Sequence, residues 1–242
     1  MPREVAEELY RAGSRRLGLS VDGWSDRTFM DSLVDLSWNS SRLEGNRYSL
    51  HAAAELLEGG ALRCDVDTVM LLNHRAAVEF LADDVSREGC SVRVLRNLHA
   101  VLMHDLIADS SSLGAIRNGA LGIAGTLYSP MQAPDVIEAM LESIVEKAVR
   151  IENPVEAALF LWIQLAYLKP FEHGNELVSR LAANIPLLLH NCAPLTFQDV
   201  TREDYARAMF AVYELRDATL AADLLSWTYR RSMTKCAAAR NA

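Results

Sequence analysis

Hydrophobic residues recur every three to four positions along most of this chain, which is the spacing of amphipathic α-helices. The pattern predicts helices over residues 2–17, 26–43, 49–59, 65–82, 92–107, 134–148, 154–168, 175–190, 203–212 and 218–233. Strand-like alternation is rare, so the predicted fold class is all-α for most of the chain.

One stretch, Ala157–Leu168, is apolar nearly all round and predicts a helix that is buried on every side. Pro170 ends it, because proline disfavours helical backbone angles in the residue before it. Gly174 supplies a turn, and Asn175 is the predicted N-cap of the next helix. A loop that leads into a helix N-terminus points free backbone N–H groups at one spot, so this loop is a natural anion site.

The pattern changes between residues 114 and 134, here called the 114–134 segment. It holds four glycines and two prolines, which exclude a long helix. The alternation of its residues predicts a short β-hairpin, and an ordinary surface loop is the alternative.

Composition and charge narrow the function classes. A chain of 242 residues that is 50% hydrophobic is large enough for one sizeable core. The net charge of −8 and the lack of a basic stripe argue against nucleic-acid binding. The four cysteines show no zinc-site spacing and no disulfide framework, and His99 and His104 do not share a helix face, so no metal site is predicted.

The sequence shows no apolar signal segment at its start and no run of eighteen apolar residues. We therefore expect a cytoplasmic protein that does not contact membranes. We also expect a single domain over residues 1–242, with N-terminal helices over 1–60, a core over 61–234 and a tail over 235–242.

Residues 168–180 read Leu-Lys-Pro-Phe-Glu-His-Gly-Asn-Glu-Leu-Val-Ser-Arg. They resemble the signature of Fic-domain proteins, His-Pro-Phe-x-(Asp/Glu)-Gly-Asn-Gly-Arg-x-x-Arg, and the matching residues are Pro170, Phe171, Gly174, Asn175 and Arg180. The resemblance covers roughly residues 26 to 230. It implies a Fic-like helical bundle in which the 114–134 segment forms a β-hairpin flap.

Four positions depart from the signature. Lys169 stands where the catalytic histidine belongs and His173 where a metal-binding acid belongs, and Glu176 and Leu177 replace the anion-hole glycine and the first arginine. In Fic enzymes, as the resemblance implies, the histidine takes a proton from a target hydroxyl, the acid holds magnesium, and the glycine and arginine cradle the phosphates of the AMP donor. We therefore expect ATP and magnesium to bind weakly or not at all, and no other cofactor is indicated.

The end of the second predicted helix resembles the inhibitory motif of Fic proteins, Ser/Thr-x-x-x-Glu-Gly/Asn, at Ser40, Glu44 and Gly45. In such proteins the glutamate pairs with the last arginine of the signature and crowds out the nucleotide γ-phosphate. The resemblance thus implies that residues 1–60 are inhibitory-type helices and that Glu44 lies within ion-pair reach of Arg180. The alternative is an exposed glutamate at a helix end with no partner.

The Gly114-x-x-Arg117 pattern resembles the start of the Fic flap, which lays an extended target segment over the active site by strand addition. The residues assigned to this flap are Arg117, Ile123, Tyr128 and Ser129. The expected partner is an extended peptide segment at the flap or an unidentified small molecule, and a homodimer stays open.

The substituted residues carry their own chemistry. To act as a general base at pH 7, Lys169 needs a pKa about 3 units below its ordinary value of about 10.4, whereas Glu172 and Glu176 would hold it charged. Histidine is a poor ligand for magnesium, which prefers oxygen. Glu176 lies in the first turn of a helix, where a phosphate would otherwise bind, so its carboxylate can act as a built-in anion. It also stands four residues before Arg180, so an ordinary helical ion pair with that arginine is the alternative.

These residues leave alternative functions. The first is a repurposed enzyme with a binding cleft formed by Phe171, Gly174, Asn175 and Arg180 and with four candidate catalytic residues, Lys169, Glu172, His173 and Glu176. The alternatives are a catalytically inactive pseudoenzyme that serves as a regulatory binding module, or a residual nucleotidyltransferase. An open cavity that reaches Lys169 and His173 would favour the enzyme, and a cleft filled by Glu44 and Glu176 would favour the module.

Overall fold

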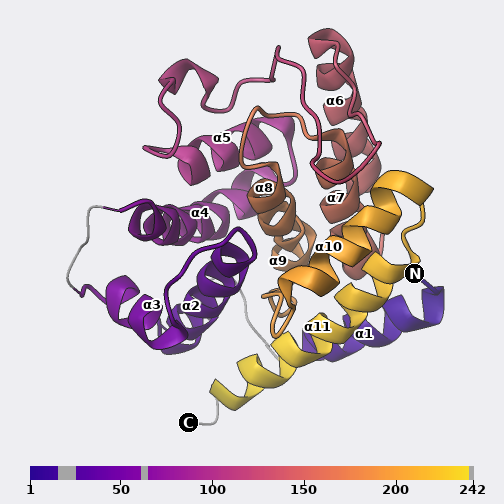
Figure 1. The fold of residues 1–242 in the computed structure, drawn as a ribbon. Helices are drawn as coiled ribbons and strands as arrows, with labels where there is room; N and C mark the ends of the chain where they lie inside the picture. The colour runs from indigo at the N-terminus through magenta and orange to yellow at the C-terminus, as the bar shows by residue number, and fades with distance from the viewer. Residues whose placement is uncertain (16–25, 61–64, 240–242) are drawn as a thin grey trace.

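The structure is a computed structural model that describes residues 1–15, 26–60 and 65–239. The described residues form a bundle of α-helices joined by turns and loops (Figure 1). The helices are α1 (Arg3–Arg15), α2 (Asp26–Leu43), α3 (Leu50–Leu57), α4 (Val66–Glu88), α5 (Val92–Met103), the 3₁₀-helix η2 (Ser110–Ser112), α6 (Pro134–Arg150), α7 (Pro154–Leu168), α8 (Asn175–Ala182), α9 (Asn184–Leu189), α10 (Arg202–Phe210), the π-helix η3 (Ala211–Leu215) and α11 (Thr219–Ala239). Among these, no helix is long and apolar enough to cross a membrane.

Helix α7 lies at the centre of the core, and its sequence explains where it begins. The side-chain oxygen of Asn153 accepts hydrogen bonds from the N–H groups of Val155 and Glu156 at 2.9 and 3.3 Å. Pro154 follows this cap in the first turn, where its missing N–H costs nothing. The helix packs against α6, α8 and α9 and is buried along nearly its whole length, which confirms the predicted buried helix.

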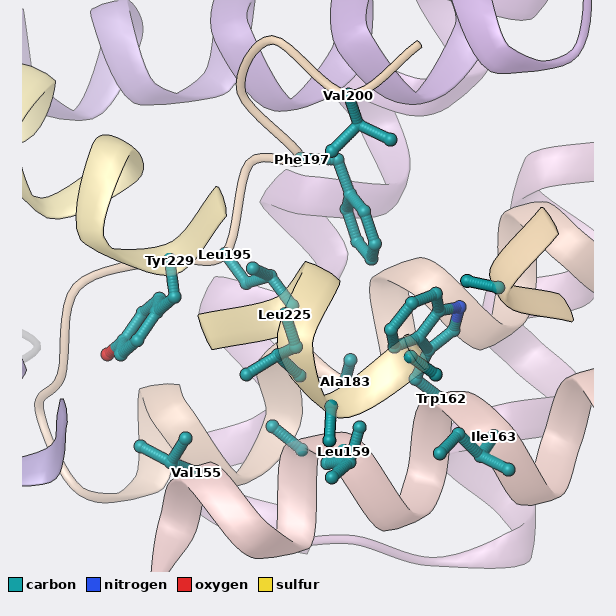
Figure 2. Close-up of a cluster of buried hydrophobic side chains, with 14 of the residues drawn as sticks. Val155, Leu159, Trp162, Ile163, Ala183, Leu195, Phe197, Val200, Leu225 and Tyr229 are labelled. Atoms are coloured by element: carbon teal, nitrogen blue, oxygen red, sulfur yellow. The ribbon is translucent and has the colours of Figure 1, made fainter. Parts of the chain in front are cut away.

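Figure 2 shows the part of the core in which α7 meets α11 and the loop that carries Phe197. Trp162 is fully buried there, and its ring meets that of Phe197 edge-on with centroids 5.3 Å apart. The indole N–H of Trp162 donates to the hydroxyl of Tyr205 at 3.1 Å. The core therefore fixes Tyr205 of α10, which belongs to the candidate site described below.

Helix α2 packs along α4, and its C-terminal part reaches α8 (Figure 1). The helix ends at Leu43, and Gly45 adopts a φ of 101° that favours glycine, so the predicted helix stop is confirmed. Ser37, Ser40 and Ser41 are completely buried on the face that α2 turns to the core. Of these serines, Ser40 bonds Arg180 of α8.

None of the described residues lies in a β-strand, so the predicted β-hairpin flap is not observed. Side chains hold the 114–134 segment together in place of a backbone ladder. The amide of Gln132 donates to the carbonyl of Leu121 and accepts from its N–H, both at 3.1 Å. Arg117 likewise donates to the carbonyl of Gly119 at 3.1 Å. Because one amide side chain satisfies both backbone groups of Leu121, a paired strand is not needed there.

Two predicted helices have different bounds in the structure. The helix predicted over residues 175–190 is divided into α8 and α9, because Asn184 bonds the backbone of Leu195 through both ends of its amide and Pro186 has no N–H. Helix α11 continues beyond residue 233 to Ala239, so the predicted tail from residue 235 is helical to that point. Residues 16–17 of the first predicted helix, residue 61 at the predicted core border and the end of the tail lie outside the described residues.

Candidate functional site

Lys169, which the resemblance aligns with the catalytic histidine, is buried and ion-paired. It follows the last residue of α7 in the left-handed conformation, with a φ of 48°. Its ammonium donates a hydrogen bond to Oε1 of Glu176 in the first turn of α8, and it lies 5.2 Å from the ring centroid of Tyr213. Only 9% of the Lys169 side chain is exposed, so the amine is committed to an internal partner.

Glu176 is also bonded by two tyrosine hydroxyls. Tyr205 donates to Oε2 and Tyr213 donates to Oε1, each at 2.8 Å. Burial acts to raise the pKa of Glu176, but the charges of Lys169 and Arg180 outweigh it and hold that pKa below its ordinary value. Burial and the charge of Glu176 raise the pKa of both tyrosines, so both are donors at neutral pH. The carboxylate is therefore ionised and well satisfied.

Arg180, the last arginine of the motif, is completely buried beneath the end of α2. Its Nε donates to the hydroxyl of Ser40 at 2.8 Å, and one terminal nitrogen donates to the Ser40 carbonyl at 3.1 Å and to Glu44 Oε1 at 2.6 Å. Burial alone would lower the pKa of Arg180, but Glu44 and its other neighbours raise it. The predicted contact between Glu44 and Arg180 is present, whereas both oxygens of Glu176 bond Lys169 and the tyrosines instead.

The backbone of the signature loop (residues 169–174) is fixed by Asn175. The amide of this residue accepts from the N–H of Phe171 at 2.9 Å and donates to its carbonyl at 2.7 Å. The predicted N-cap role of Asn175 is therefore wrong: Gly174 is the N-cap of α8, with a φ of 68°. The amide of Asn175 reaches back to the loop because Phe171 offers it both a donor and an acceptor.

We expect Gly174→Ala to lower the free energy of unfolding by about 1–3 kcal/mol, because a φ above zero is strained for alanine. An added Cβ would also lie 2.4 Å from the sulfur of Met103, whose flexible side chain would have to move. Denaturation by urea measures the loss. Gly125→Ala is a matched control with a φ of 79° and no atom within 4 Å of the added Cβ. Equal losses in the two variants would contradict a role for the Met103 contact.

A cavity of about 530 Å³ opens beside the signature loop and is here called the acidic cavity. Its walls carry the carboxylates of Glu44, Asp109 and Glu172, together with the imidazole of His173. Hydrogen bonds from Ser111 lower the pKa of Asp109, so that group is ionised at neutral pH. The remaining wall is mostly apolar and includes Val66, Met70, Met103, Leu106, Ile107 and Leu177.

The four candidate catalytic residues form two separate groups. Lys169 and Glu176 contact each other inside the protein, whereas Glu172 and His173 are exposed and line the acidic cavity. Neither Lys169 nor Glu176 is among the residues that line this cavity. Within the described residues, no group of three His, Cys, Asp or Glu side chains could hold a metal ion.

The residues assigned to the flap hold their own segment against the signature loop. The buried guanidinium of Arg117 donates to the carbonyl of Lys169 at 2.7 Å, and Ile123 packs against the core cluster around α7. The hydroxyl of Tyr128 donates to the carbonyl of Tyr167 at 2.8 Å, while Ser129 is exposed. A second, open cavity of about 800 Å³ lies beside this part of the segment.

Reasoning from the sequence missed three residues that shape the site: His99, Tyr205 and Tyr213. His99 stacks on Phe171 with ring centroids 4.1 Å apart, and the two tyrosines bond Glu176 from α10 and η3. The position of His99 among the apolar residues of its helix was the available signal, since it places this imidazole on the buried face. Nothing in the sequence links residues 205 and 213 to Glu176.

Comparison with known proteins was made by sequence and by structure. A search of the curated proteins finds no match to this chain. The Fic/DOC family model matches residues 90–187, a range that includes α5, the 114–134 segment and the signature loop.

Solved structures of Fic proteins match the fold. A Fic family protein from Desulfovibrio desulfuricans is 18% identical, with a TM-score of 0.77 over 100% of this chain and 76% of that one. Fic-1 from C. elegans is 18% identical, with a TM-score of 0.81 over 99% and 72% of the two chains. A variant of IbpAFic2 in complex with adenylylated Cdc42 is 14% identical, with a TM-score of 0.59 over 96% and 69%. The resemblance predicted from the sequence is confirmed, and these structures show the fold alone.

Proposed function

We propose, from the premise that this chain carries a Fic domain, that it serves as a binding module and does not transfer AMP. The charge of the acidic cavity is the observation that carries the proposal. In the part of the chain that the structure describes, the cavity is lined by three carboxylates and by no lysine or arginine. A basic group, such as a lysine or arginine side chain of an extended peptide, is the ligand class that this lining favours.

Electrostatics argue against a nucleotide in the acidic cavity. Two like charges 4 Å apart repel by about 1 kcal/mol in water and about 4 kcal/mol at an effective dielectric constant of 20. A triphosphate beside Asp109 and Glu172 would meet such repulsion. The N-terminus of α8 gives no compensation, because the carboxylate of Glu176 already occupies its first turn.

The separation of the candidate catalytic residues argues against a repurposed enzyme. A general base needs a free lone pair within reach of its substrate. The amine of Lys169 is bonded to Glu176, and both oxygens of Glu176 accept hydrogen bonds from buried donors. The pair thus has little capacity left for a substrate, while His173 stands at the acidic cavity without either of them.

Residual AMP transfer has even less support. IbpAFic2 is seen in complex with adenylylated Cdc42. The same chemistry in this chain would need a phosphate cradle, and Glu176 and Leu177 stand where the family places its glycine and arginine. Glu44 would also have to leave Arg180 before that guanidinium could meet a phosphate. We therefore also propose that Ser40, Glu44 and Gly45 act as an inhibitory-type motif that keeps Arg180 from a phosphate.

We propose that residues 1–242 act as one domain. The partner that we propose is an extended peptide that lies along the 114–134 segment. Leu127 of this segment is 94% exposed and is therefore accessible to a partner. Leu127, Tyr128 and Met131 line the open cavity beside the segment, where a side chain of the peptide would fit.

We expect isothermal titration calorimetry with Mg-ATP to show no micromolar binding to the unmodified protein. The Glu44→Gly variant should behave in the same way, because removal of the inhibitory-type carboxylate does not restore the missing glycine and arginine. Micromolar binding by the unmodified protein would contradict the proposal. Micromolar binding by Glu44→Gly alone would mean that the site is merely inhibited.

The same measurement with extended peptides tests the ligand class. Peptides with lysine or arginine side chains should bind more tightly than matched peptides with glutamate. Glu172→Gln should raise the dissociation constant of the basic peptides by about twofold to fivefold, which is the effect expected of one exposed ion pair. Glu203→Gln, on α10 and outside the cavity, is the control. Equal binding of basic and acidic peptides would overturn the assignment of a basic ligand.

A further inference from the structure

His99 of α5 makes contacts on several sides although only 1% of the residue is exposed. The N–H of Gly114 donates to its Nδ1 at 2.8 Å, and its Nε2 lies 3.2 Å from the carbonyl of His173. Its ring stacks on Phe171 with an angle of 15° between the planes. One imidazole thus joins α5, the start of the 114–134 segment and the signature loop.

These two hydrogen bonds fix the protonation state of the imidazole. A backbone N–H can only donate, so Nδ1 of His99 must carry a free lone pair toward Gly114. The single proton of a neutral ring therefore sits on Nε2, where the carbonyl of His173 can accept it. A second proton on Nδ1 would place two donors face to face and break the bond to Gly114.

Gly114 can approach α5 this closely only because it has no Cβ. Its φ is 71°, and an added Cβ would lie 2.8 Å from the backbone carbonyl of Arg96. A backbone atom cannot swing away as a side chain can, so the position of Gly114 is narrowly defined. At the other end, Asn175 holds the backbone of Phe171 through two hydrogen bonds.

We infer that His99, in its neutral Nε2–H form, is a positioning residue that, together with Arg117, ties the start of the 114–134 segment to the signature loop. Through the His173 carbonyl it sets the place of Glu172 and His173 at the wall of the acidic cavity. This inference goes beyond the proposed function, because it concerns the geometry of the loop whichever ligand the cavity takes.

The electrostatic surroundings of His99 agree with the neutral form. The pKa of His99 is lowered to about 4: burial is the largest cause, the hydrogen bond to the His173 carbonyl acts in the opposite direction, and the charge of the His173 side chain also lowers it. Within the described residues, no carboxylate of α4, α6 or α8 bonds this ring. The imidazole is therefore neutral at pH 7 and gains its second proton only in acid.

Nuclear magnetic resonance tests the hydrogen bond between Gly114 and His99 directly in the full chain. At pH 7 we expect a scalar coupling across the hydrogen bond between the Gly114 amide nitrogen and His99 Nδ1. The coupling should disappear as the pH falls to about 4, together with the protection of the Gly114 amide from exchange. Absence of the coupling at pH 7, or its persistence in a protonated ring, would overturn the inference.

Two substitutions separate positioning from simple packing. His99→Gln can still accept from Gly114 and donate to the His173 carbonyl, so it should keep the Gly114 amide protected from exchange at pH 7 and should not lose that protection in acid. His99→Phe keeps the stack on Phe171 without either hydrogen bond, and the Gly114 amide should exchange about fivefold to tenfold faster. His190→Gln is the control, because this histidine bonds the carbonyl of Pro186.

Two outcomes would contradict the positioning role of His99. Unchanged exchange at Gly114 in His99→Phe would show that the imidazole does not hold the segment. An acid-induced loss of Gly114 protection that persists in His99→Gln would show that another group titrates. If His99→Phe does not fold, the His99→Gln comparison and the coupling in the unmodified protein still decide the question.

Discussion

Lys169→Met is expected to lower the free energy of unfolding by about 3–5 kcal/mol, because it leaves the buried Glu176 carboxylate without its directly bonded cation. For a domain of this size the loss corresponds to a fall in the melting temperature of about 6–20 °C. The ammonium of Lys169 and the carboxylate of Glu176 form an ion pair inside the protein. Only 9% of the Lys169 side chain and 22% of the Glu176 side chain are exposed. Calorimetry and urea denaturation at pH 7 measure the effect.

The double variant Lys169→Met, Glu176→Gln should recover most of the loss, because the amide oxygen can accept from one tyrosine hydroxyl, its NH₂ group can donate to the other, and no lone charge remains. Arg207→Met, which breaks an exposed pair with Glu203, should cost less than about 1 kcal/mol and serves as the control. A loss of that small size for Lys169→Met would contradict the buried ion pair described here.

The pH dependence of Lys169→Met follows from the lowered pKa of Glu176 in the folded protein. A carboxyl group with a lowered folded-state pKa stabilises the fold above its unfolded-state pKa, and this contribution is lost as the pH falls through the folded-state value. The difference in stability between the unmodified protein and Lys169→Met should therefore shrink in acid, below the ordinary glutamate value of 4.5. A difference that grows in acid would contradict the assigned charge of Glu176.

Restoring the Fic signature is expected to create AMP transfer where the unmodified protein has none. The variant combines Lys169→His, His173→Asp, Glu176→Gly, Leu177→Arg and Glu44→Gly, and self-labelling by an ATP analogue is the readout. Labelling should exceed that of the unmodified protein by at least about 10²-fold, the effect of one oxyanion-type donor. Lys169→His alone should stay silent, because the phosphate cradle would still be missing.

The control for this variant carries Lys169→Ala with the other four changes, and it should not label. Labelling by the unmodified protein would overturn the proposed function. Silence from a folded five-site variant would contradict the expectation that only the signature and Glu44 separate this chain from an active enzyme. Circular dichroism establishes whether each variant is folded.

Much of the fold could be predicted from the sequence, because helix periodicity and helix ends are local signals. The apolar run that became α7, the glycine after α2 and the serine before α3 each mark an element within a few residues of its observed bounds. The contact of Glu44 with Arg180 was predictable only through the family resemblance, since 136 residues separate the two.

The parts that could not be predicted depend on contacts between distant side chains. Gln132 holds the 114–134 segment without a strand partner, and no local pattern distinguishes that from a hairpin. Tyr205 and Tyr213 reach Glu176 from elements that the sequence does not connect to it. The sequence pattern excludes His99 as a metal ligand but does not show that its imidazole is buried and accepts a hydrogen bond from Gly114.

The internal pair of Lys169 and Glu176 has a consequence for how this sequence can have changed over generations. Either residue alone would leave an unpaired charge inside the protein, so a lineage that altered one first would have passed through a less stable form. Replacement of the pair by a histidine and a glycine would meet the same barrier, because each single change is penalised until the other occurs. Such sign epistasis makes the altered signature hard to reverse by single substitutions, even in the absence of selection for a new function.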